Sequence, residues 1–206
     1  MGKWSGKTVI GLTGNIGSGK SVVRKMLEQL GAYGIDADAL TYRAMLPGAP
    51  GFDPVLKKFG SWILSEDGTI NRARLGSIVF NDPFAMKELE QIVHPLVIEA
   101  VDILVKNATQ PVIVIEAIKL IESGMAAECN SIWVTEVTPD VQIKRLITKR
   151  GMRVSEARMR IKAQPPQADK VNASDVVINN SGSFTETFQQ VVNAWKKTVP
   201  PEVQGT

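Results

Sequence analysis

The sequence predicts an α/β protein built on a parallel β-sheet, and three observations support this fold class. Apolar runs typical of strands alternate along the chain with segments of helical spacing. A glycine-rich loop lies between the first predicted strand and the first predicted helix. The stretch 53–106 has no clear strand pattern, which indicates a helical insertion. Helices cover both faces of such a sheet, and ligands are expected at the carboxyl ends of its strands.

The elements follow in order from local patterns. The predicted strands are 8–12, 33–35, 112–115, 132–137 and 176–178, and the predicted helices of the sheet region are 20–30, 139–150, 155–163 and 184–197. Glycine at position 31 suits the end of the first helix, and Pro139 suits the first position of the second. Ser183 with Glu186 predicts a capping box for the last helix.

Breakers define the remaining boundaries. Gly151 interrupts two basic helices, the second of which Ser155 is expected to cap. The pair Pro165-Pro166 ends that helix, and His94-Pro95 ends a helical pattern within the insertion. The tail 200–206 is predicted to be loose.

Composition limits the function classes. The chain has 206 residues, of which 44% are hydrophobic and 22% charged, so one compact domain or a core with an inserted subdomain is expected. Cys129 is the only cysteine, which excludes an internal disulfide and suits a reducing cytoplasm. His94 is the only histidine, which excludes multi-histidine metal sites and makes a hydrolase triad unfavoured.

Charge and hydropathy narrow the expected partners. The net charge is +3, and basic residues are scattered except over 144–162, so a nucleic-acid partner is not expected. No apolar run approaches the ~20 residues that span a membrane, and no signal-peptide pattern is present. We therefore expect a cytoplasmic protein without a membrane partner.

The strongest motif is a phosphate-binding loop. It matches G-x-x-x-x-G-K-[ST] in full through Gly14, Asn15, Ile16, Gly17, Ser18, Gly19, Lys20 and Ser21. Glycines let backbone N–H groups converge on phosphate oxygens at a helix N-terminus. Lys20 is expected to reach the β and γ phosphates of a nucleotide, and Ser21 to ligate Mg²⁺. The alternative is a glycine-rich turn with an exposed lysine.

Carboxylates at strand ends are further candidates. Asp36 and Asp38 are expected on one side of an extended segment near the loop, where one of them accepts a proton from an attacking hydroxyl. An acidic turn or a helix cap is the structural alternative. Glu116 ends an aliphatic strand and is typical of an acid that holds Mg²⁺ through water, although it also suits an ordinary strand end.

A basic segment surrounds Gly151. Its members are Arg145, Lys149, Arg150, Arg153, Arg158 and Arg160. Such a segment suits a lid that closes over phosphates and excludes water. A solvated helical hairpin is the alternative.

The ordered motifs resemble the dephospho-coenzyme A kinase family over nearly the whole chain. They are L-T-G-N-I-G-S-G-K-S (12–21), D-A-D (36–38), P-G (47–48), D-G-T-I-N-R-x-x-L (67–75), I-V-F-x-D-P (78–83), L-E-x-I-V-H-P-L-V (89–97) and A-S-D-V-V-I-N-N-S-G-S (173–183). The resemblance implies a three-layer P-loop kinase fold that transfers the γ-phosphate of ATP to the ribose 3′-hydroxyl of dephospho-coenzyme A. It implies a core of 7–38 and 110–200, a coenzyme A-binding insertion of about 39–108, and a lid of about 145–165.

The resemblance also assigns residues. Asp38 would be the catalytic base, with Lys20 and Arg145 completing the catalytic group. Asp36, Arg72, His94 and Pro95 would contact substrate, and Gln164 and Lys170 fit the stretch after the lid. A monomer or weak homo-oligomer using ATP and Mg²⁺ is implied.

The chain departs from the family pattern near the phosphates. Val22 replaces the usual small polar residue after the loop serine, which removes a possible hydroxyl contact to phosphate. Glu116 replaces an aspartate and is one methylene longer, and Ile118 and Lys119 replace a proline and a leucine.

Two rival functions remain at this point. A nucleoside or nucleotide monophosphate kinase shares the loop, insertion and lid. A nucleotide-dependent switch shares the loop alone, although the absence of an N-K-x-D guanine signature disfavours a GTPase.

Overall fold

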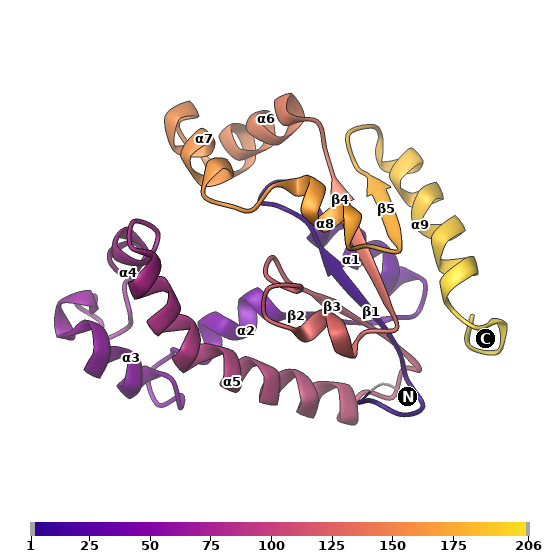
Figure 1. The fold of residues 1–206 in the computed structure, drawn as a ribbon. Coiled ribbons are helices and arrows are strands. Elements are labelled where there is room, and N and C mark those ends of the chain that lie inside the picture. Colours follow the sequence, from indigo (N-terminus) through magenta and orange to yellow (C-terminus); the bar gives the residue numbers. More distant parts are fainter. Residues whose placement is uncertain (1–2, 205–206) are drawn as a thin grey trace. The chain divides into compact units, whose positions relative to one another are not determined.

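A computed structural model describes residues 3–204 and contains a five-stranded, fully parallel sheet (Figure 1). The strands are β1 (Thr8–Thr13), β2 (Tyr33–Asp36), β3 (Val112–Glu116), β4 (Ser131–Glu136) and β5 (Val176–Asn179), in the spatial order β2-β3-β1-β4-β5. The predicted α/β class is confirmed. Because β1 is central and all strands run parallel, the loops after β1, β3 and β4 emerge at the same edge.

The helices are named in chain order. They are α1 (Lys20–Gln29), α2 (Ala37–Arg43), α3 (Phe52–Phe59), α4 (Arg72–Val79), α5 (Pro83–Asn107), α6 (Pro139–Arg150), α7 (Val154–Lys162), α8 (Gln167–Asn172) and α9 (Phe184–Thr198). Short 3₁₀ turns are η1 (Ser61–Ile63), η2 (Met125–Glu128) and η3 (Pro201–Val203).

The sheet core is apolar on both faces. On one face, α1 and α9 pack through Val23, Met26, Leu27, Val191 and Trp195 against Ile10, Leu12, Val112, Val114, Trp133 and Ile178 of the strands. On the other face, a Cβ at Gly11 would lie 2.7 Å from Leu120 and 2.9 Å from Cys129. The segment after β3 therefore packs directly on the β1 backbone, and only glycine leaves the necessary room.

Local signals set one end of two helices as predicted: the C-terminus of α1 and the N-terminus of α9. The N–H of Ala32 donates to Leu27 at 3.0 Å and that of Gly31 to Glu28 at 3.0 Å, with Gly31 at φ +101°, which is a Schellman motif. At α9, the Ser183 side chain accepts from the N–H of Glu186, whose carboxylate accepts from the N–H of Ser183. The capping box is confirmed.

Contacts divide the described chain into two compact units. Residues 37–104 form one unit, and the remaining described residues form the other. The first of these has its own apolar core, made of Met45, Val55, Ile63, Ile70, Leu75, Val79, Ala85, Leu89 and Val93. Its only β-structure is an isolated antiparallel bridge between Leu64 and Ile70, all within residues that the structure describes.

The structure corrects the expected setting of the two aspartates. Asp36 is the last residue of β2, but Asp38 lies in the first turn of α2 rather than on the same side of an extended segment. The D-A-D step is therefore the junction of a strand and a helix, and an acidic residue is favourable in the first turn of that helix.

Other boundaries also differ from the predictions. The cap of α7 is Arg153, so Ser155 lies inside the helix. Pro95 lies within α5, which continues to Asn107, so His94-Pro95 does not end that helix. The double proline is followed directly by α8, which sequence patterns did not predict.

The predicted loose tail is also wrong for its described residues. Residues 201–203 form η3, and Val203 packs against the sheet core. The Gln204 side chain donates to the carbonyl of Lys196 at 3.0 Å. Residues 205–206 lie outside the part of the chain that the structure describes.

Candidate active site

The glycine-rich loop joins β1 to α1 in a conformation that requires its glycines. Gly14, Gly17 and Gly19 have φ values of +143°, +77° and +94°, a region that L side chains rarely adopt. A Cβ at Gly14 would lie 2.5 Å from the Thr135 carbonyl oxygen, and one at Gly19 would lie 1.9 Å from Nδ2 of Asn180. Both positions exclude any larger residue, because backbone and buried side chains already occupy that space.

Lys20 and Ser21 open α1 at the end of this loop. The Lys20 side chain is buried, and its Nζ donates to the carbonyl oxygen of Gly14 at 3.0 Å. The interpretation as a turn with an exposed lysine is therefore wrong. Val22 is 39% exposed on the same turn, so its side chain contributes little to the core.

Polar side chains from β4, α6 and the end of β5 hold the loop from outside. Oγ of Ser18 and Oγ1 of Thr135 share a hydrogen bond of 2.7 Å. Asn180 donates from Nδ2 to the Ser18 carbonyl at 2.9 Å, and Gln142 donates from Nε2 to the Ile16 carbonyl at 2.7 Å. Sequence reasoning missed these supports, although Asn180 lies within the A-S-D-V-V-I-N-N-S-G-S motif.

The stretch between α7 and α8 also contacts the loop. Gln164 accepts from the N–H of Ile16 at 2.7 Å, and Gln167 accepts from the N–H of Asn15 at 3.0 Å. Asn15 donates from Nδ2 to the carbonyl of Pro165 at 3.0 Å. The double proline therefore places two glutamine side chains on the loop backbone, which only the fold reveals.

Lys170 supports the neighbouring loop rather than the phosphate loop. Its side chain is 2% exposed, and Nζ donates to the Ile118 carbonyl and to Glu122, both at 2.7 Å. These bonds fix the segment that follows Glu116. A buried lysine needs such partners, because an unpaired buried charge is costly.

Glu116 faces the beginning of α1. Oγ of Ser21 donates to Oε1 of Glu116 at 2.7 Å, and Nε of Arg24 donates to Oε2 at 2.7 Å. The Glu116 side chain is only 5% exposed. The strand end is therefore joined to the phosphate loop by its acid.

Arg24 also reaches the end of β2. Its NH2 lies 3.9 Å from Oδ2 of Asp36, and its NH1 pairs with Glu28 one turn along α1. Burial alone would lower the pKa of Arg24, but the hydrogen bond from Arg24 to Glu116 and the charges of Glu116 and Glu28 raise it above its ordinary value. Sequence analysis missed Arg24, which looks like an ordinary helix-surface cation.

Oxygen donors for a divalent cation converge here. Ser21 and Glu116 bring hard oxygen atoms together from neighbouring elements, which is the donor type that Mg²⁺ prefers. Among the described residues, no group of three or more His, Cys, Asp or Glu side chains is placed to hold a metal by itself. This set fits Mg²⁺, which uses one or two protein ligands and completes its shell with substrate phosphates and water.

The other predicted substrate residues lie in the unit formed by 37–104. Asp38 and Tyr42 are four residues apart on α2 and so share one helix face. The Arg72 guanidinium lies 5.0 Å from the centre of the Tyr42 ring. Asp38, Tyr42 and Arg72 therefore belong to one surface, on which Tyr42 was not predicted. The structure does not join His94 or Pro95, both on α5, to this group.

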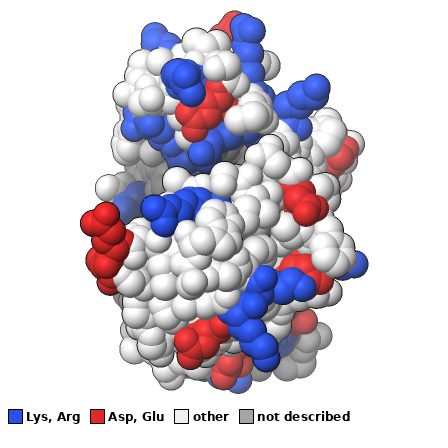
Figure 2. Space-filling model, turned by 90° about the vertical axis from the view of Figure 1, so that its left-hand side faces the viewer, with Lys and Arg blue, Asp and Glu red and all other residues white. Residues whose placement is uncertain are grey.

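Arg145 projects from α6 to the phosphate loop. Its NH2 donates to the Asn180 carbonyl at 2.7 Å, and its NH1 to the Ser18 carbonyl at 3.4 Å. The other predicted cations of this segment, Lys149, Arg150, Arg153, Arg158 and Arg160, are exposed. Figure 2 shows Lys and Arg gathered at the top of that view, where Figure 1 places α6 and α7.

The α6–α7 pair also has an apolar contact with the loop. Leu146 and Ala157 are fully buried against Ile16, with Met152 and Ile161 beside them. Gly151 ends α6 at φ +64°, which allows the sharp change of direction. The segment is thus a two-helix arm with one face packed on the loop and one face in solvent.

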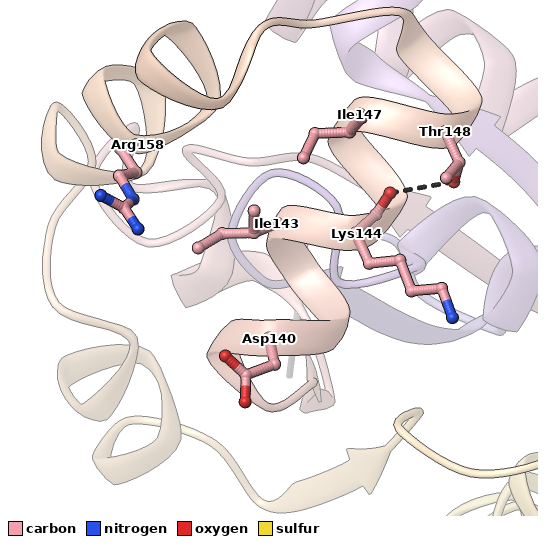
Figure 3. Close-up of a pocket in the computed structure, with 6 residues that line it drawn as sticks. All are labelled: Asp140, Ile143, Lys144, Ile147, Thr148 and Arg158. Atoms are coloured by element: carbon pink, nitrogen blue, oxygen red, sulfur yellow. Dashed lines mark hydrogen bonds between the residues drawn. The ribbon is translucent and has the colours of Figure 1, made fainter.

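An open pocket of about 320 Å³ lies on the outer side of this arm (Figure 3). It is lined by Asp140, Ile143, Lys144, Ile147, Thr148 and Arg158. Thr148 donates to the Lys144 carbonyl at 2.9 Å, which is a bond within α6. None of the phosphate-loop residues lines this pocket.

A glycine loop of this geometry, facing an acid on the adjacent parallel strand, cradles nucleotide phosphates. The fold and this site place the chain among the P-loop kinases. The sequence pattern of the family described as dephospho-CoA kinase matches residues 8–186. The chain belongs to the dephospho-CoA kinase family, whose members phosphorylate dephospho-CoA with ATP in the final step of coenzyme A synthesis.

Individual relatives and solved structures resemble this chain over nearly its whole length. The dephospho-CoA kinase of Geobacter sulfurreducens is 39% identical over 195 residues, which cover 93% of this chain and 99% of the relative. A crystal structure from Thermus thermophilus matches with a TM-score of 0.83 and 28% identity over 94% of this chain and 98% of that one. The dephospho-CoA kinase structure from Campylobacter jejuni matches with a TM-score of 0.64 and 25% identity, covering 93% and 96%.

One further observation concerns membranes. Within residues 3–204, no helix combines the length and the apolar character needed to cross a bilayer.

Proposed function

We propose that this chain transfers the γ-phosphoryl group of ATP to the ribose 3′-hydroxyl of dephospho-coenzyme A, giving coenzyme A and ADP. The observation that carries the proposal is the hydrogen bond between Ser21 and Glu116 at the carboxyl edge of β1 and β3, next in sequence to the buried Lys20 of the phosphate loop. The acceptor comes from the family to which the chain belongs. Such sites act almost wholly by positioning and charge stabilisation.

The loop Gly14–Ser21 is proposed to bind ATP. Its backbone N–H groups and the N-terminus of α1 supply positive potential to the phosphates. Lys20 exchanges its bond to Gly14 for the β and γ phosphate oxygens, and Val22 flanks the same turn. Arg145, which already lies against the Ser18 carbonyl, donates to the phosphates as negative charge develops.

Ser21 and Glu116 are proposed to hold Mg²⁺. The Ser21 hydroxyl donates a hydrogen bond to Glu116, which leaves the lone pairs of Oγ available to ligate the ion. Glu116 would hold the ion through a water molecule. When bound, the ion neutralises charge on the β and γ phosphates during transfer.

The acceptor site is proposed to lie on the unit 37–104. Asp38 accepts the proton of the 3′-hydroxyl as the oxygen attacks the γ-phosphorus in line. Asp36, Arg72, His94 and Pro95 contact the substrate, with Arg72 suited to its phosphates because guanidinium forms bidentate bonds. In this proposal, 39–108 is the coenzyme A-binding subdomain between the core segments 7–38 and 110–200.

The arm of α6 and α7, about 145–165, is proposed to be a lid. Gly151 permits a change of angle, and the exposed arginines add positive charge when the arm closes over the nucleotide. Closure excludes water, which would otherwise accept the phosphoryl group. We also propose a cytoplasmic protein without a nucleic-acid partner, because the single cysteine suits a reducing compartment and the charge of +3 is modest. For its assembly we propose a monomer or weak homo-oligomer.

A coupled ADP-release assay with dephospho-coenzyme A tests the proposal. Steady multiple turnover is expected, and mass analysis should show one added phosphoryl group. Treatment with a 3′-nucleotidase should remove that group, whereas the same incubation without the enzyme should leave it in place, which would locate it at the 3′ position. Nucleoside monophosphates in the same assay test the rival kinase function. Turnover with them and not with dephospho-coenzyme A would reject the proposed acceptor, and a single turnover would favour the switch.

A further inference from the structure

Arg24 lies at the centre of three carboxylates beside the proposed metal site. It donates to Glu116 at 2.7 Å, pairs with Glu28, and lies 3.9 Å from Asp36. Asp36 and Glu116 are register partners at the ends of two adjacent parallel strands. Their like charges would repel in the absence of a cation. The positive charge of Arg24 therefore offsets the repulsion that arises because the sheet places these two carboxylates side by side.

The position of Glu28 shows that the network is sterically defined. A Cβ at Gly34 on β2 would lie 1.9 Å from Oε1 of Glu28 and 2.8 Å from its Cδ. The missing side chain at Gly34 thus provides the space in which Glu28 meets Arg24. The Arg24 side chain is 14% exposed, and partners on α1, β2 and β3 hold it from different directions.

Both oxygens of Glu116 are used in this arrangement. Oε2 is held by Arg24 and Oε1 accepts from Ser21, so the rotation of the carboxylate is fixed by two bonds. The Ser21 proton is thereby directed to Glu116. The serine lone pairs are left for a cation, which is the geometry that a metal-bound nucleotide needs.

We propose that Arg24 is a positioning residue that locks Glu116 against Ser21 and so favours the Mg²⁺-bound form of the nucleotide over the metal-free form. The inference rests on the proposed metal role of Ser21 and Glu116. Arg24 touches neither nucleotide nor metal in this role, and it acts through Glu116.

The two possible roles of Arg24, orienting Glu116 or acting as a charge alone, predict opposite effects of its removal on binding of the Mg²⁺-nucleotide. A cation near the site repels Mg²⁺, so if Arg24 acted by charge alone, its removal would strengthen the binding of the metal nucleotide. If Arg24 orients Glu116, its removal weakens that binding, because outer partners of metal ligands contribute about 10- to 100-fold to metal affinity. The sign of the change therefore decides between the two roles.

The experiment measures ADP binding by calorimetry with saturating Mg²⁺ and again in EDTA. The ratio of the two affinities is the metal-dependent gain. We expect Arg24→Met and Arg24→Lys each to reduce this gain about tenfold while leaving metal-free ADP affinity within about twofold. Arg24→Lys keeps the charge but lacks the planar group that spans Glu116 and Glu28, and it keeps the test valid if Arg24→Met does not fold.

Two controls isolate the path through Glu116. Lys25→Met removes a cation from the next position on α1. The Lys25 side chain is 70% exposed, and among the ion pairs of the described residues it pairs only with Glu28. The metal-dependent gain in ADP affinity should not change in this variant. Arg24→Lys combined with Glu116→Gln should show no loss beyond that of Glu116→Gln alone, because residues acting as one unit are non-additive.

The outcomes separate this inference from the proposed function. A lower melting temperature with an unchanged or larger gain in both Arg24 variants would show a purely structural counter-ion and overturn the inference. Absence of any gain in the unmodified protein would overturn it together with the metal assignment. Failure to phosphorylate dephospho-coenzyme A would overturn the proposed acceptor, while the loss of gain in the Arg24 variants would still support the positioning role.

Discussion

Nζ of Lys20 donates a hydrogen bond to the carbonyl oxygen of Gly14, six residues earlier, at 3.0 Å. The bond closes the phosphate loop on itself and holds a buried ammonium at the mouth of the loop. A neutral carbonyl oxygen is a weaker partner for an ammonium than charged phosphate oxygens are. Nucleotide phosphates are therefore expected to take the place of the Gly14 carbonyl beside Lys20.

We expect Lys20→Met to lower kcat by at least about a hundredfold, because the ammonium stabilises charge that develops on the transferred group. The fold should persist, since methionine fills a similar volume, and the lost hydrogen bond to Gly14 is worth about 1–3 kcal/mol. Steady-state rates and thermal melts measure both effects. Lys25→Met on the same helix is the matched control, and near-normal kcat in folded Lys20→Met would contradict the loop assignment.

Replacing Asp38 should lower kcat more than replacing Asp36. Asp38→Asn is expected to reduce kcat by about a hundredfold, the scale of a lost general base. Asp36→Asn should reduce it less, because Asp36 contacts Arg24 at the strand end rather than the reacting hydroxyl in this proposal. Parallel kcat measurements compare the two variants, and a larger loss for Asp36→Asn would reverse the assigned roles.

Val22→Thr should lower the KM for ATP. Val22 is 39% exposed at the start of α1, so a hydroxyl can be added without opening a core cavity. A hydrogen bond to a charged phosphate oxygen contributes about 1.5–3 kcal/mol at most. Val23→Thr, at a fully buried position, is the control and should lower stability without lowering KM. An equal or higher KM in Val22→Thr would show that this position does not face phosphate.

Arg145→Lys should lower kcat more than it weakens ATP binding, because it keeps the charge but loses the two-armed donor that reaches Ser18 and Asn180. Lys144→Met is the control on the outer side of α6, where Lys144 lines the pocket of Figure 3.

The lid proposal adds an expectation for hydrogen exchange. Amide exchange over 149–163 should slow when both substrates bind. Unchanged exchange together with unaffected kcat in Arg145→Lys and Arg150→Lys would make this segment a solvated arm only.

Cys129 should react slowly in the folded protein. Burial, with a smaller effect from Glu128, raises the pKa of its thiol from 9.0 to about 12. The folded protein at pH 8 then holds roughly a thousandfold less thiolate than the unfolded chain, and alkylation should be slower in proportion. Mass spectrometry with iodoacetamide measures this rate with and without denaturant, and equal rates would contradict the raised pKa.

The raised pKa of Cys129 also makes the free energy of unfolding depend on pH. Because the folded pKa lies above the unfolded value, the contribution of Cys129 is complete below pH 9 and decreases as the pH rises toward 12. Cys129→Ala should remove this part of the alkaline decline in the free energy of unfolding.

The sequence by itself determined the parallel sheet, the phosphate loop and the family. These depend on local information: aliphatic runs make the buried strands, glycines at fixed spacing allow the positive φ angles of the loop, and Ser183 with Glu186 begins α9. Each signal lies within a few residues of the structure that it predicts. The ordered motifs alone then indicated the dephospho-CoA kinase family.

Tertiary structure alone decided what surrounds the loop. Gln142 contacts Ile16 across 126 positions in the chain, Asn180 contacts Ser18 across 162, and Arg24 contacts Glu116 across 92. Glutamine, asparagine and arginine on a helix or after a strand look like solvent-exposed residues in a sequence. They become site residues because the strand order β2-β3-β1-β4-β5 brings these distant strand ends and helices to one edge, where buried carbonyls and carboxylates need partners.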